Sequence, residues 1–367
     1  MQPYVPCSLP VANLDYHRLF ALVGEANAEL ALYDGLLQGI VNPSVMLSPL
    51  ANEEAVLSSR IEGTQATVDE VLEQEAGLIK EGEKGKDIQE IINYREAMLS
   101  AQGYLVDRPI TLAFVRELHK VLLNSVRGQD KTPGAFRTDQ NWIGSAGCSM
   151  EEASFVPPNP LQLQDHLEAW QAYMATKDID PLLQTAVVHA QFELLHPFRD
   201  GNGRIGRILI PLFLFQKKKL SQPMFYLSSY LERNREEYYE RLNRISKDGD
   251  WDGWIEFFLK AIMLQARANN KKVRKIMGLY EEMKAQVQEI TRSQYGIQVL
   301  DAIFNRPIFT TTDFVTRSGI NKKTAMALLS QLRSNEILTV ARESSGQRPA
   351  VLAFPRLLNI AEGKKIF

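Results

Sequence analysis

Apolar residues recur at spacings of three and four along most of this chain, which is the spacing of amphipathic helices. The first such segment, Tyr16 to Gln38, ends before Asn42-Pro43, because the residue before a proline disfavours the α region. Strand signals are few, and a polar, glycine-containing turn is expected at 81–86. Further helices are predicted over 49–63, from 67 onward, and over 88–102, 111–124, 161–174, 181–195, 202–218, 230–247 and 251–268. The pattern predicts a mainly α-helical protein.

Residues 134–160 interrupt the helical pattern. They read GAFRTDQNWIGSAGCSMEEASFVPPNP, rich in Gly, Ser and Pro, with short apolar pieces on each side. This composition predicts a β-hairpin or an extended flap with a long tip.

The last part of the chain has a different pattern. A helix at 293–305 precedes FTTTDFVTRSG, which predicts a threonine cap and a short helix ending at Gly319. A longer helix, NKKTAMALLSQLRSNEIL, and two short strands around a polar turn follow. Three helices and a hairpin predict a winged helix-turn-helix. We therefore divide the chain into a helical N-terminal region (1–105), a core (106–268), a helical connector (269–290) and this module (291–367).

Composition and charge narrow the picture only slightly. The net charge of -2 over 367 residues argues against bulk attraction to nucleic acid, although a local basic face stays open. Cys7 and Cys148 are the two cysteines, which favours a reducing compartment. The longest apolar run, 208–215, is far shorter than the roughly 20 residues of a membrane span, and MQPYVPCSLP lacks the features of a signal peptide. We expect a cytoplasmic protein without a membrane segment.

The stretch HPFRDGNGRIGR, residues 196–207, combines the parts of a phosphate site. The backbone at 201–203 can approach an anion closely, because glycine has no side chain, and the free N–H groups of the helix that follows favour phosphate. Asp200 offers a hard oxygen ligand suited to Mg²⁺. Arg204 and Arg207 share one helix face, and a neutral His196 can take a proton from a hydroxyl.

This run resembles the Fic signature, HxFx(D/E)GNGRxxR, at every fixed position. The resemblance implies a Fic-type helical bundle with a β-hairpin flap. It also implies transfer of AMP from ATP to a Ser, Thr or Tyr hydroxyl of target proteins and of the enzyme itself. His196 is then the general base, and Asp200 holds Mg²⁺ (or Mn²⁺). The expected ATP-binding residues are Glu62, Asn141, Trp142, Ile143, Gly144, Gly201, Asn202, Gly203, Arg204, Ile205, Gly206, Arg207, Tyr238 and Tyr239.

A second stretch, SSRIEGT, resembles the inhibitory helix of the same family, (S/T)xxxE(G/N), with Ser58, Glu62 and Gly63 at the fixed positions. Ser58 and Glu62 lie one turn apart on one helix face. The resemblance implies that Glu62 pairs with Arg207, displaces the γ-phosphate and holds ATP in an unproductive pose. In some relatives this glutamate also supports removal of AMP, and the sequence leaves that activity open.

The resemblance assigns two further regions. GAFRTDQNWIGS is similar to the flap that pairs with the target protein, with 141–144 as the edge beside ATP. Tyr238 and Tyr239 match the paired tyrosines near the adenine. Some relatives carry an asparagine seven positions later, where this chain has Ser246. The remaining histidines, for which we expect structural roles, are His17, His119, His166 and His189.

Three functions remain in competition at this stage. The first is the autoinhibited adenylyltransferase. The second is a DNA-binding regulator whose Fic domain senses nucleotide; its C-terminal contacts would be Asn321, Lys322, Lys323, Thr324, Arg333, Arg342 and Arg348. The third is a Fic enzyme that transfers another phosphate-containing group, although the Gly-Asn-Gly run is the pattern of the AMP-transferring branch. A homodimer is also compatible with the resemblance, and the target is not readable.

Overall fold

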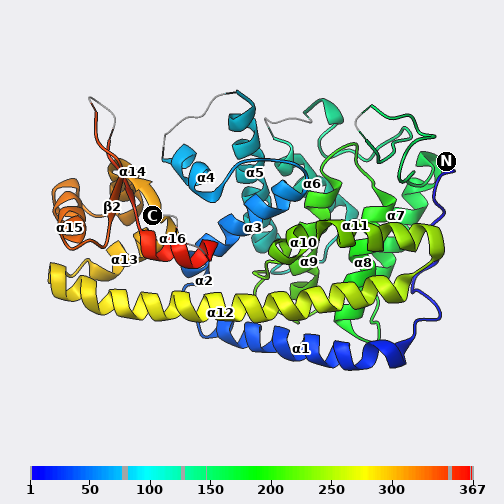
Figure 1. Cartoon of the computed structure of the whole chain (residues 1–367), viewed down its shortest axis with the longest axis horizontal. Helices are drawn as coiled ribbons and strands as arrows, with labels where there is room; N and C mark the ends of the chain where they lie inside the picture. The colour runs from blue at the N-terminus through cyan, green and yellow to red at the C-terminus, as the bar shows by residue number, and fades with distance from the viewer. Residues whose placement is uncertain are drawn as a thin grey trace. The chain divides into compact units, whose positions relative to one another are not determined.

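The computed structural model describes residues 2–76, 82–124, 129–145, 147–345, 349–363 and 365. The protein is mainly helical, as predicted, with one small sheet (Figure 1). It forms two compact units. The first comprises Met1–Asp34, Leu57–Thr64 and Ile92–Arg267, and the second comprises Gly35–Val56, Gln65–Ile91 and Ala268–Phe367. Helix by helix, none of the described segments is both long and apolar enough to cross a membrane.

The helices up to residue 291 follow the predicted order. Their bounds are α1 Tyr16–Gln38, α2 Pro43–Met46, α3 Ser48–Ile61, α4 Val68–Glu75, α5 Gly82–Tyr104, α6 Leu112–Leu122, α7 Pro160–Ala175, α8 Pro181–Leu195, α9 Asn202–Gln216, α10 Ser228–Arg233, α11 Arg235–Asp248 and α12 Trp251–Thr291, with a 3-10 turn η1 at Gln129–Lys131. The four-part division into 1–105, 106–268, 269–290 and 291–367 stays a prediction.

Three helix boundaries differ from the sequence prediction. The expected turn at 81–86 is wrong over 82–86, where α5 already begins; Glu and Lys are good helix formers, and Glu83 pairs with Lys86 one turn later at 2.8 Å. Residue 81 lies outside the described residues. The predicted helix 230–247 is interrupted at Asn234, whose Nδ2 donates to the Tyr230 carbonyl at 2.8 Å. The predicted core helix and connector form one helix, α12, which has no proline.

The first unit is built around α8, which packs against α7, α9 and α11. Almost every side chain of α8 and α9 is buried, so both helices belong to the core along their whole length. Trp170, Trp254 and Phe258 pack beside α8, with Trp170 and Trp254 each donating their indole N–H to a carbonyl of this helix. This dense packing fixes the loop between α8 and α9.

The second unit carries the C-terminal elements: α13 Gly296–Asn305, β1 Ile308–Thr310, α14 Thr311–Ser318, α15 Lys322–Ser334, β2 Thr339–Arg342, β3 Val351–Ala353 and α16 Pro355–Glu362. The sheet order is β1-β3-β2, with both pairs antiparallel and Leu352 opposite Phe309 and Val340. Strand β1 and helix α16 were not predicted. The three helices and the hairpin are present in the expected order, and the winged-helix assignment itself stays a prediction. Gly346, Gln347 and Arg348 of the expected wing lie outside the described residues.

Candidate active site

His196 stands at the junction between α8 and the loop that leads to α9. It adopts a left-handed backbone conformation (φ 45°, ψ 59°), and its N–H donates to the Phe192 carbonyl at 3.1 Å. The ring Nδ1 lies 3.4 Å from the Glu193 carbonyl, which can only accept, so Nδ1 carries the proton and Nε2 is left as a base. Burial lowers the pKa of His196 to about 4, so the ring is neutral at pH 7.

Arg137 holds this strained turn in place. Its buried guanidinium donates to the carbonyls of His196 (3.0 Å), Pro158 (2.6 Å) and Leu195 (3.4 Å). Burial lowers its pKa to about 10, and the group stays charged at neutral pH. Because Arg137 and Pro158 belong to the two ends of the flap, one side chain fixes the flap to the loop that begins at His196.

The loop from 197 to 201 is closed by the first residue of α9. Asn202 accepts from the Phe198 N–H and donates to the Phe198 carbonyl, both at 2.8 Å. Gly201 has a φ of 78°, a conformation that favours glycine, and it precedes the first turn of α9. The loop therefore delivers the free N–H groups of that turn in a fixed position.

His119 of α6 supports the loop from behind. Its Nδ1 accepts from the Gly134 N–H at 2.9 Å, so Nε2 is the protonated nitrogen and donates to the Asp200 carbonyl at 2.9 Å. The ring stacks on Phe198 with centroids 3.7 Å apart and an interplanar angle of 7°. Burial lowers the pKa of His119 to about 4 and keeps it neutral. The expected structural role of this histidine is thus a specific one, joining flap and loop.

Arg207 is the most enclosed cation of the site, with a side chain only 1 % exposed. Its Nε donates to Ser58 Oγ at 2.8 Å, and its Nη2 donates to the Ser58 carbonyl at 2.9 Å and to Glu62 Oε1 at 2.6 Å. Burial opposes ionisation of Glu62, but the guanidinium outweighs burial and lowers the pKa of this carboxyl. Gly63 ends α3 with a φ of 104°. The predicted pair of Glu62 and Arg207 is present.

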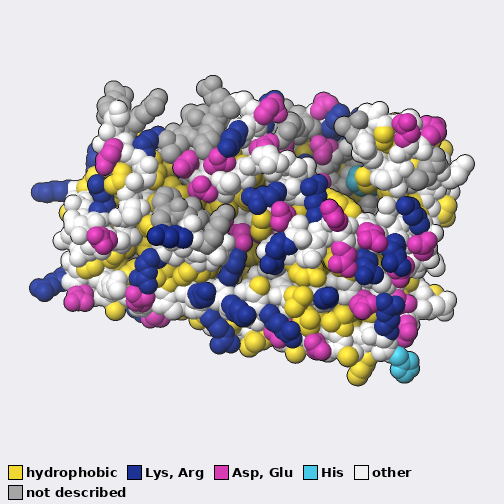
Figure 2. Space-filling view, in the orientation of Figure 1, with side chains coloured by type: hydrophobic (Ala, Val, Ile, Leu, Met, Phe, Trp, Pro, Cys, Tyr) yellow, Lys and Arg dark blue, Asp and Glu magenta, His cyan; other side chains and the backbone are white. Residues whose placement is uncertain are grey.

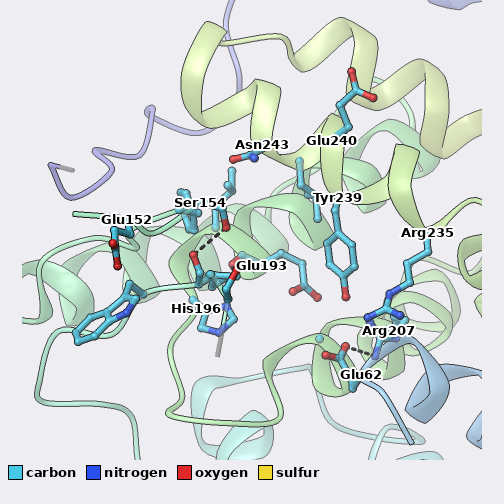
Figure 3. Close-up of a pocket in the computed structure, with 18 residues that line it drawn as sticks. Glu62, Glu152, Ser154, Glu193, His196, Arg207, Arg235, Tyr239, Glu240 and Asn243 are labelled. Atoms are coloured by element: carbon cyan, nitrogen blue, oxygen red, sulfur yellow. Dashed lines mark hydrogen bonds and ion pairs between the residues drawn. The ribbon is translucent and has the colours of Figure 1, made fainter. Parts of the chain in front are cut away.

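A cavity of about 770 Å³ opens beside these groups, within the size range of small-molecule sites. His196, Glu62 and Arg207 all face it (Figure 3). Predicted site residues that line it are Glu62, Trp142, Ile143, Gly144, His196, Gly203, Arg207 and Tyr239. A base with a free nitrogen, a helix N-terminus and an arginine thus meet at one cavity.

Two models of the Fic/DOC family match the chain, the N-terminal one over residues 20–103 and the Fic/DOC one over 109–214, together more than half of its length. The chain belongs to the Fic/DOC family. It is 28% identical to a probable protein adenylyltransferase of Aquifex aeolicus over 53% of this chain and 55% of that protein. It is 26% identical to protein adenylyltransferase fic-1 of Caenorhabditis elegans over 51% of this chain and 34% of that one. The chain thus spans about half the length, or less, of these relatives.

Solved structures show the same fold. A Fic family protein from Desulfovibrio desulfuricans superposes with a TM-score of 0.60 at 19% identity, covering 96% of this chain and 98% of the other. Residues 134–508 of Fic-1 from C. elegans superpose with a TM-score of 0.53 at 20% identity, covering 70% of this chain and 71% of theirs. At such identities the likeness concerns the fold, which is the Fic fold that the motif implied.

Other predicted residues of this Fic protein lie behind or beside the cavity. Tyr238 is buried, and its hydroxyl lies 3.0 Å from His189 Nε2. Asn141 lines a neighbouring depression and donates to the Phe198 carbonyl at 3.2 Å. The residues that build the loop and the first turns of α9 without lining the cavity are Asp200, Gly201, Asn202, Arg204, Ile205 and Gly206. Ser246 donates to the carbonyl of Asn243, and it is Asn243 that lines the cavity.

The cavity also includes residues that the motif comparison missed, among them Glu193, Arg235, Ser154 and Asn243. Glu193 stands three positions before His196, so helical spacing alone places both on the same side of the last turn of α8. Arg235 lies four residues before Tyr239, and its guanidinium is 5.8 Å from the centre of that ring. The sequence could therefore have indicated Glu193 from its spacing to His196, and Arg235 from its spacing to Tyr239.

The flap is less regular than a β-hairpin. Among its described residues the only ladder contact is an isolated antiparallel bridge between Ile143 and Phe155, with the Ile143 N–H donating to Phe155 at 2.9 Å. The Trp142 indole donates to the Cys148 carbonyl at 2.9 Å and folds the tip instead of extending the ladder. The expectation of a β-hairpin was therefore too regular, and the extended-flap alternative describes the segment. Trp142 and Ile143 remain exposed there.

Asp200 suits the metal that the family implies. Its Oδ1 accepts from the Gly201 N–H at 2.6 Å and lies 3.4 Å from Arg204 Nη2, while the side chain is 40% exposed at the start of α9. Within the described part of the chain no group of three or more His, Cys, Asp or Glu could form a metal cage. A single accessible carboxylate fits an ion that takes most of its ligands from phosphates and water.

Proposed function

We propose that this Fic protein is a Mg²⁺-dependent protein adenylyltransferase held inactive by Glu62. One observation carries the proposal: the free Nε2 of a neutral His196 faces the same cavity as Gly203 and Arg207. A base beside an anion site is what transfer of a phosphate-containing group to a hydroxyl requires. The adenylyltransferase names of the relatives support AMP as the transferred group.

In the proposed reaction, the target hydroxyl attacks the α-phosphorus of ATP and gives its proton to His196 Nε2. The new bond joins the hydroxyl oxygen to phosphorus, the bond to the β-phosphate oxygen breaks, and pyrophosphate leaves. The first N–H groups of α9 and the arginines neutralise charge on the phosphates. Asp200 would hold Mg²⁺, which supplies further charge neutralisation to the polyphosphate.

Autoinhibition follows from competition for Arg207. Ser58 and Glu62 accept from its Nε and Nη2, so a phosphate that needs those donors must first displace the end of α3. Glu62 also occupies space next to α9, because its Oε1 would lie 2.2 Å from a Cβ at Gly203. We propose that this placement misaligns ATP until Glu62 withdraws.

We propose that the flap presents the protein target. Trp142 and Ile143 are exposed, and the backbone N–H groups of residues 140–142 donate to none of the described residues. An extended target segment can add main-chain hydrogen bonds to such an edge and bring its hydroxyl to His196. Recognition through main chain accounts for modification of the protein itself as well as of targets.

The proposal is tested by the position of the label. The Glu62→Gly variant, in which Arg207 is released, is incubated with Mg²⁺ and ATP labelled on either the α- or the γ-phosphate, and the protein is analysed by intact mass. AMP transfer predicts incorporation of the α-label alone, with a mass gain of one AMP. Incorporation of the γ-label would instead identify a phosphotransferase and overturn the proposal.

DNA binding by the second unit is a second candidate, favoured by the exposed face of α15. Apart from Met326 and Ala327 that face is polar or basic, and it carries no acidic side chain. Its other members are Asn321, Lys322, Lys323, Ser330, Gln331, Arg333 and Ser334. A helix of this kind can enter the major groove with its N-terminal lysines near phosphates.

We expect full-length protein to bind a labelled DNA duplex with an affinity that falls as salt rises. Lys322→Glu with Lys323→Glu should weaken binding and lower the salt slope by about one for each lost phosphate contact. The matched control is Lys284→Glu with Lys120→Glu, at exposed positions on other helices. Fluorescence anisotropy measures the DNA affinity of each double variant. Equal DNA affinities of the two double variants would exclude α15 as the contact helix.

A further inference from the structure

Glu193 is a carboxylic acid in the cavity to which the proposed mechanism gives no role. It projects from the last turn of α8 between His196 and Tyr239 (Figure 3). Its Oε1 is buried and has no hydrogen-bond partner among the described residues. Buried acceptors are nearly always paired, so this one calls for an explanation.

Two glycines of α9, one turn apart, make room for two carboxylates. A Cβ at Gly203 would lie 2.2 Å from Glu62 Oε1, and a Cβ at Gly206 would lie 2.1 Å from Glu193 Oε1. Arg207 follows directly, and its Nη1 is buried without a partner in the described structure. The acid that directly follows α3 and an acid of α8 thus lie against the same helix, α9, beside Arg207.

The charges around Glu193 explain why it is unpaired. The titratable groups that interact with it are Arg207 on α9, Glu62 at the end of α3, and Tyr238 and Tyr239 on α11. The backbone carbonyl of Glu193 accepts a hydrogen bond from His196 Nδ1. Burial, assisted by the Glu62 charge and opposed by Arg207, raises the pKa of Glu193 to about 8. While Glu62 holds Arg207, Glu193 is therefore neutral at pH 7.

Withdrawal of Glu62 changes this balance. Arg207 would keep its hydrogen bonds to Ser58 but lose its anionic partner, and a buried guanidinium without a counter-charge is costly. Of the carboxyls that act electrostatically on Arg207, Glu62 and Glu193 are the two identified. With the repulsion from Glu62 also gone, ionisation of Glu193 and pairing with Arg207 become favourable.

We propose that Glu193 is a positioning residue that replaces Glu62 as the counter-ion of Arg207, and that an incoming nucleotide phosphate displaces it with uptake of one proton from solvent. This inference rests on the proposed function, in which a nucleotide phosphate binds Arg207. The neutral acid then no longer competes for the guanidinium. Nucleotide binding to the released enzyme is consequently coupled to pH through a side chain that does not touch the reacting atoms.

The test is calorimetric titration of the full-length Glu62→Gly variant with Mg²⁺ and α,β-methylene ATP, whose α–β bridge cannot be cleaved. Titrations at pH 7 to 8.5 in buffers of different ionisation enthalpy report protons taken up. We expect uptake approaching one proton per nucleotide, and a Kd that rises towards the limit of about tenfold per pH unit for one linked proton. Glu62→Gly with Glu193→Gln should lose this uptake and bind more tightly at pH 8.5.

Protonation of the nucleotide itself is common to both variants and cancels in the comparison. Equal proton uptake by the two variants overturns the role of Glu193 while leaving the nucleotide site intact. Failure of both to bind nucleotide overturns the site, and with it the proposed function. Glu193→Leu, of similar size and without a charge, is the second variant should the glutamine substitution disturb folding, and it should behave in the same way.

Discussion

Replacing His196 with alanine is expected to lower AMP transfer by about 100- to 10,000-fold, the usual contribution of a positioned general base. The structure gives the reason. Nδ1 is committed to the Glu193 carbonyl, so Nε2 is free to accept a proton inside the cavity. Alanine removes that nitrogen and leaves Arg207 and the first turn of α9 unchanged. The measurement is the initial rate of α-label incorporation, made in the Glu62→Gly background, with nucleotide affinity measured alongside.

The pH profile gives an independent check on the same residue. Burial lowers the pKa of His196 to about 4, so the basic form is present above that value and is lost as the pH falls through it. We expect the acid limb of the rate near pH 4, well below the ordinary histidine value of about 6.5. His17→Ala, on the exposed side of α1, is the matched control and should leave the rate unchanged. A His196→Ala rate equal to that of its parent would rule out the base.

Glu62→Gly is expected to raise AMP transfer by about 5- to 150-fold, the range that a coupling free energy of about 1–3 kcal/mol produces. The substitution removes the carboxylate 2.6 Å from Arg207 Nη2 and clears the space above Gly203. Incorporation of α-label by the variant and by the wild type is compared at saturating ATP.

Graded variants separate the charge from the helix. Glu62→Gln keeps an acceptor for Arg207 but loses the charge, so its rate should fall between the wild type and Glu62→Gly. Ser58→Ala removes one neutral acceptor and should activate less than either. Glu117→Gly, at an exposed position of α6, controls for the effect of a new glycine in a helix. If the rate of Glu62→Gly stays at the wild-type level, the contact with Arg207 is not inhibitory.

The part of the site that follows the motif was readable from the sequence, because its residues are contiguous and their roles are set locally. Gly201 ends the loop and α9 begins at Asn202, as expected. The contact between Glu62 and Arg207 joins residues 145 positions apart, and only the family resemblance indicated it. Nothing in local spacing places α3 against α9, since that depends on the packing of the whole unit.

Strand β1, the continuity of α12 and the surroundings of Glu193 could not be predicted from the sequence, each for a different physical reason. Strand β1 has three residues, all buried, so it shows no alternation of apolar and polar positions. The continuity of α12 depends on buried residues such as Val273 and Ile276, which extend its apolar face beyond the expected end of the core. The spacing of Glu193 to His196 was readable, but its close packing against α9 was not, because the room for its carboxyl comes from Gly206 on another helix.

The two hydrogen bonds of the His119 ring have a consequence for any attempt to redesign the targets of the proposed transfer. The ring accepts a hydrogen bond from the Gly134 N–H and donates one to the Asp200 carbonyl. A Cβ at position 134 would lie 3.2 Å from the Arg116 carbonyl oxygen. Exchanging the exposed tip around Trp142 leaves this anchor untouched, so new target preferences can be grafted there. Inserting or deleting a residue near Gly134 would shift the nucleotide loop as well. Changes at the flap tip should therefore alter target choice without moving the nucleotide loop. Changes at the flap root should alter both.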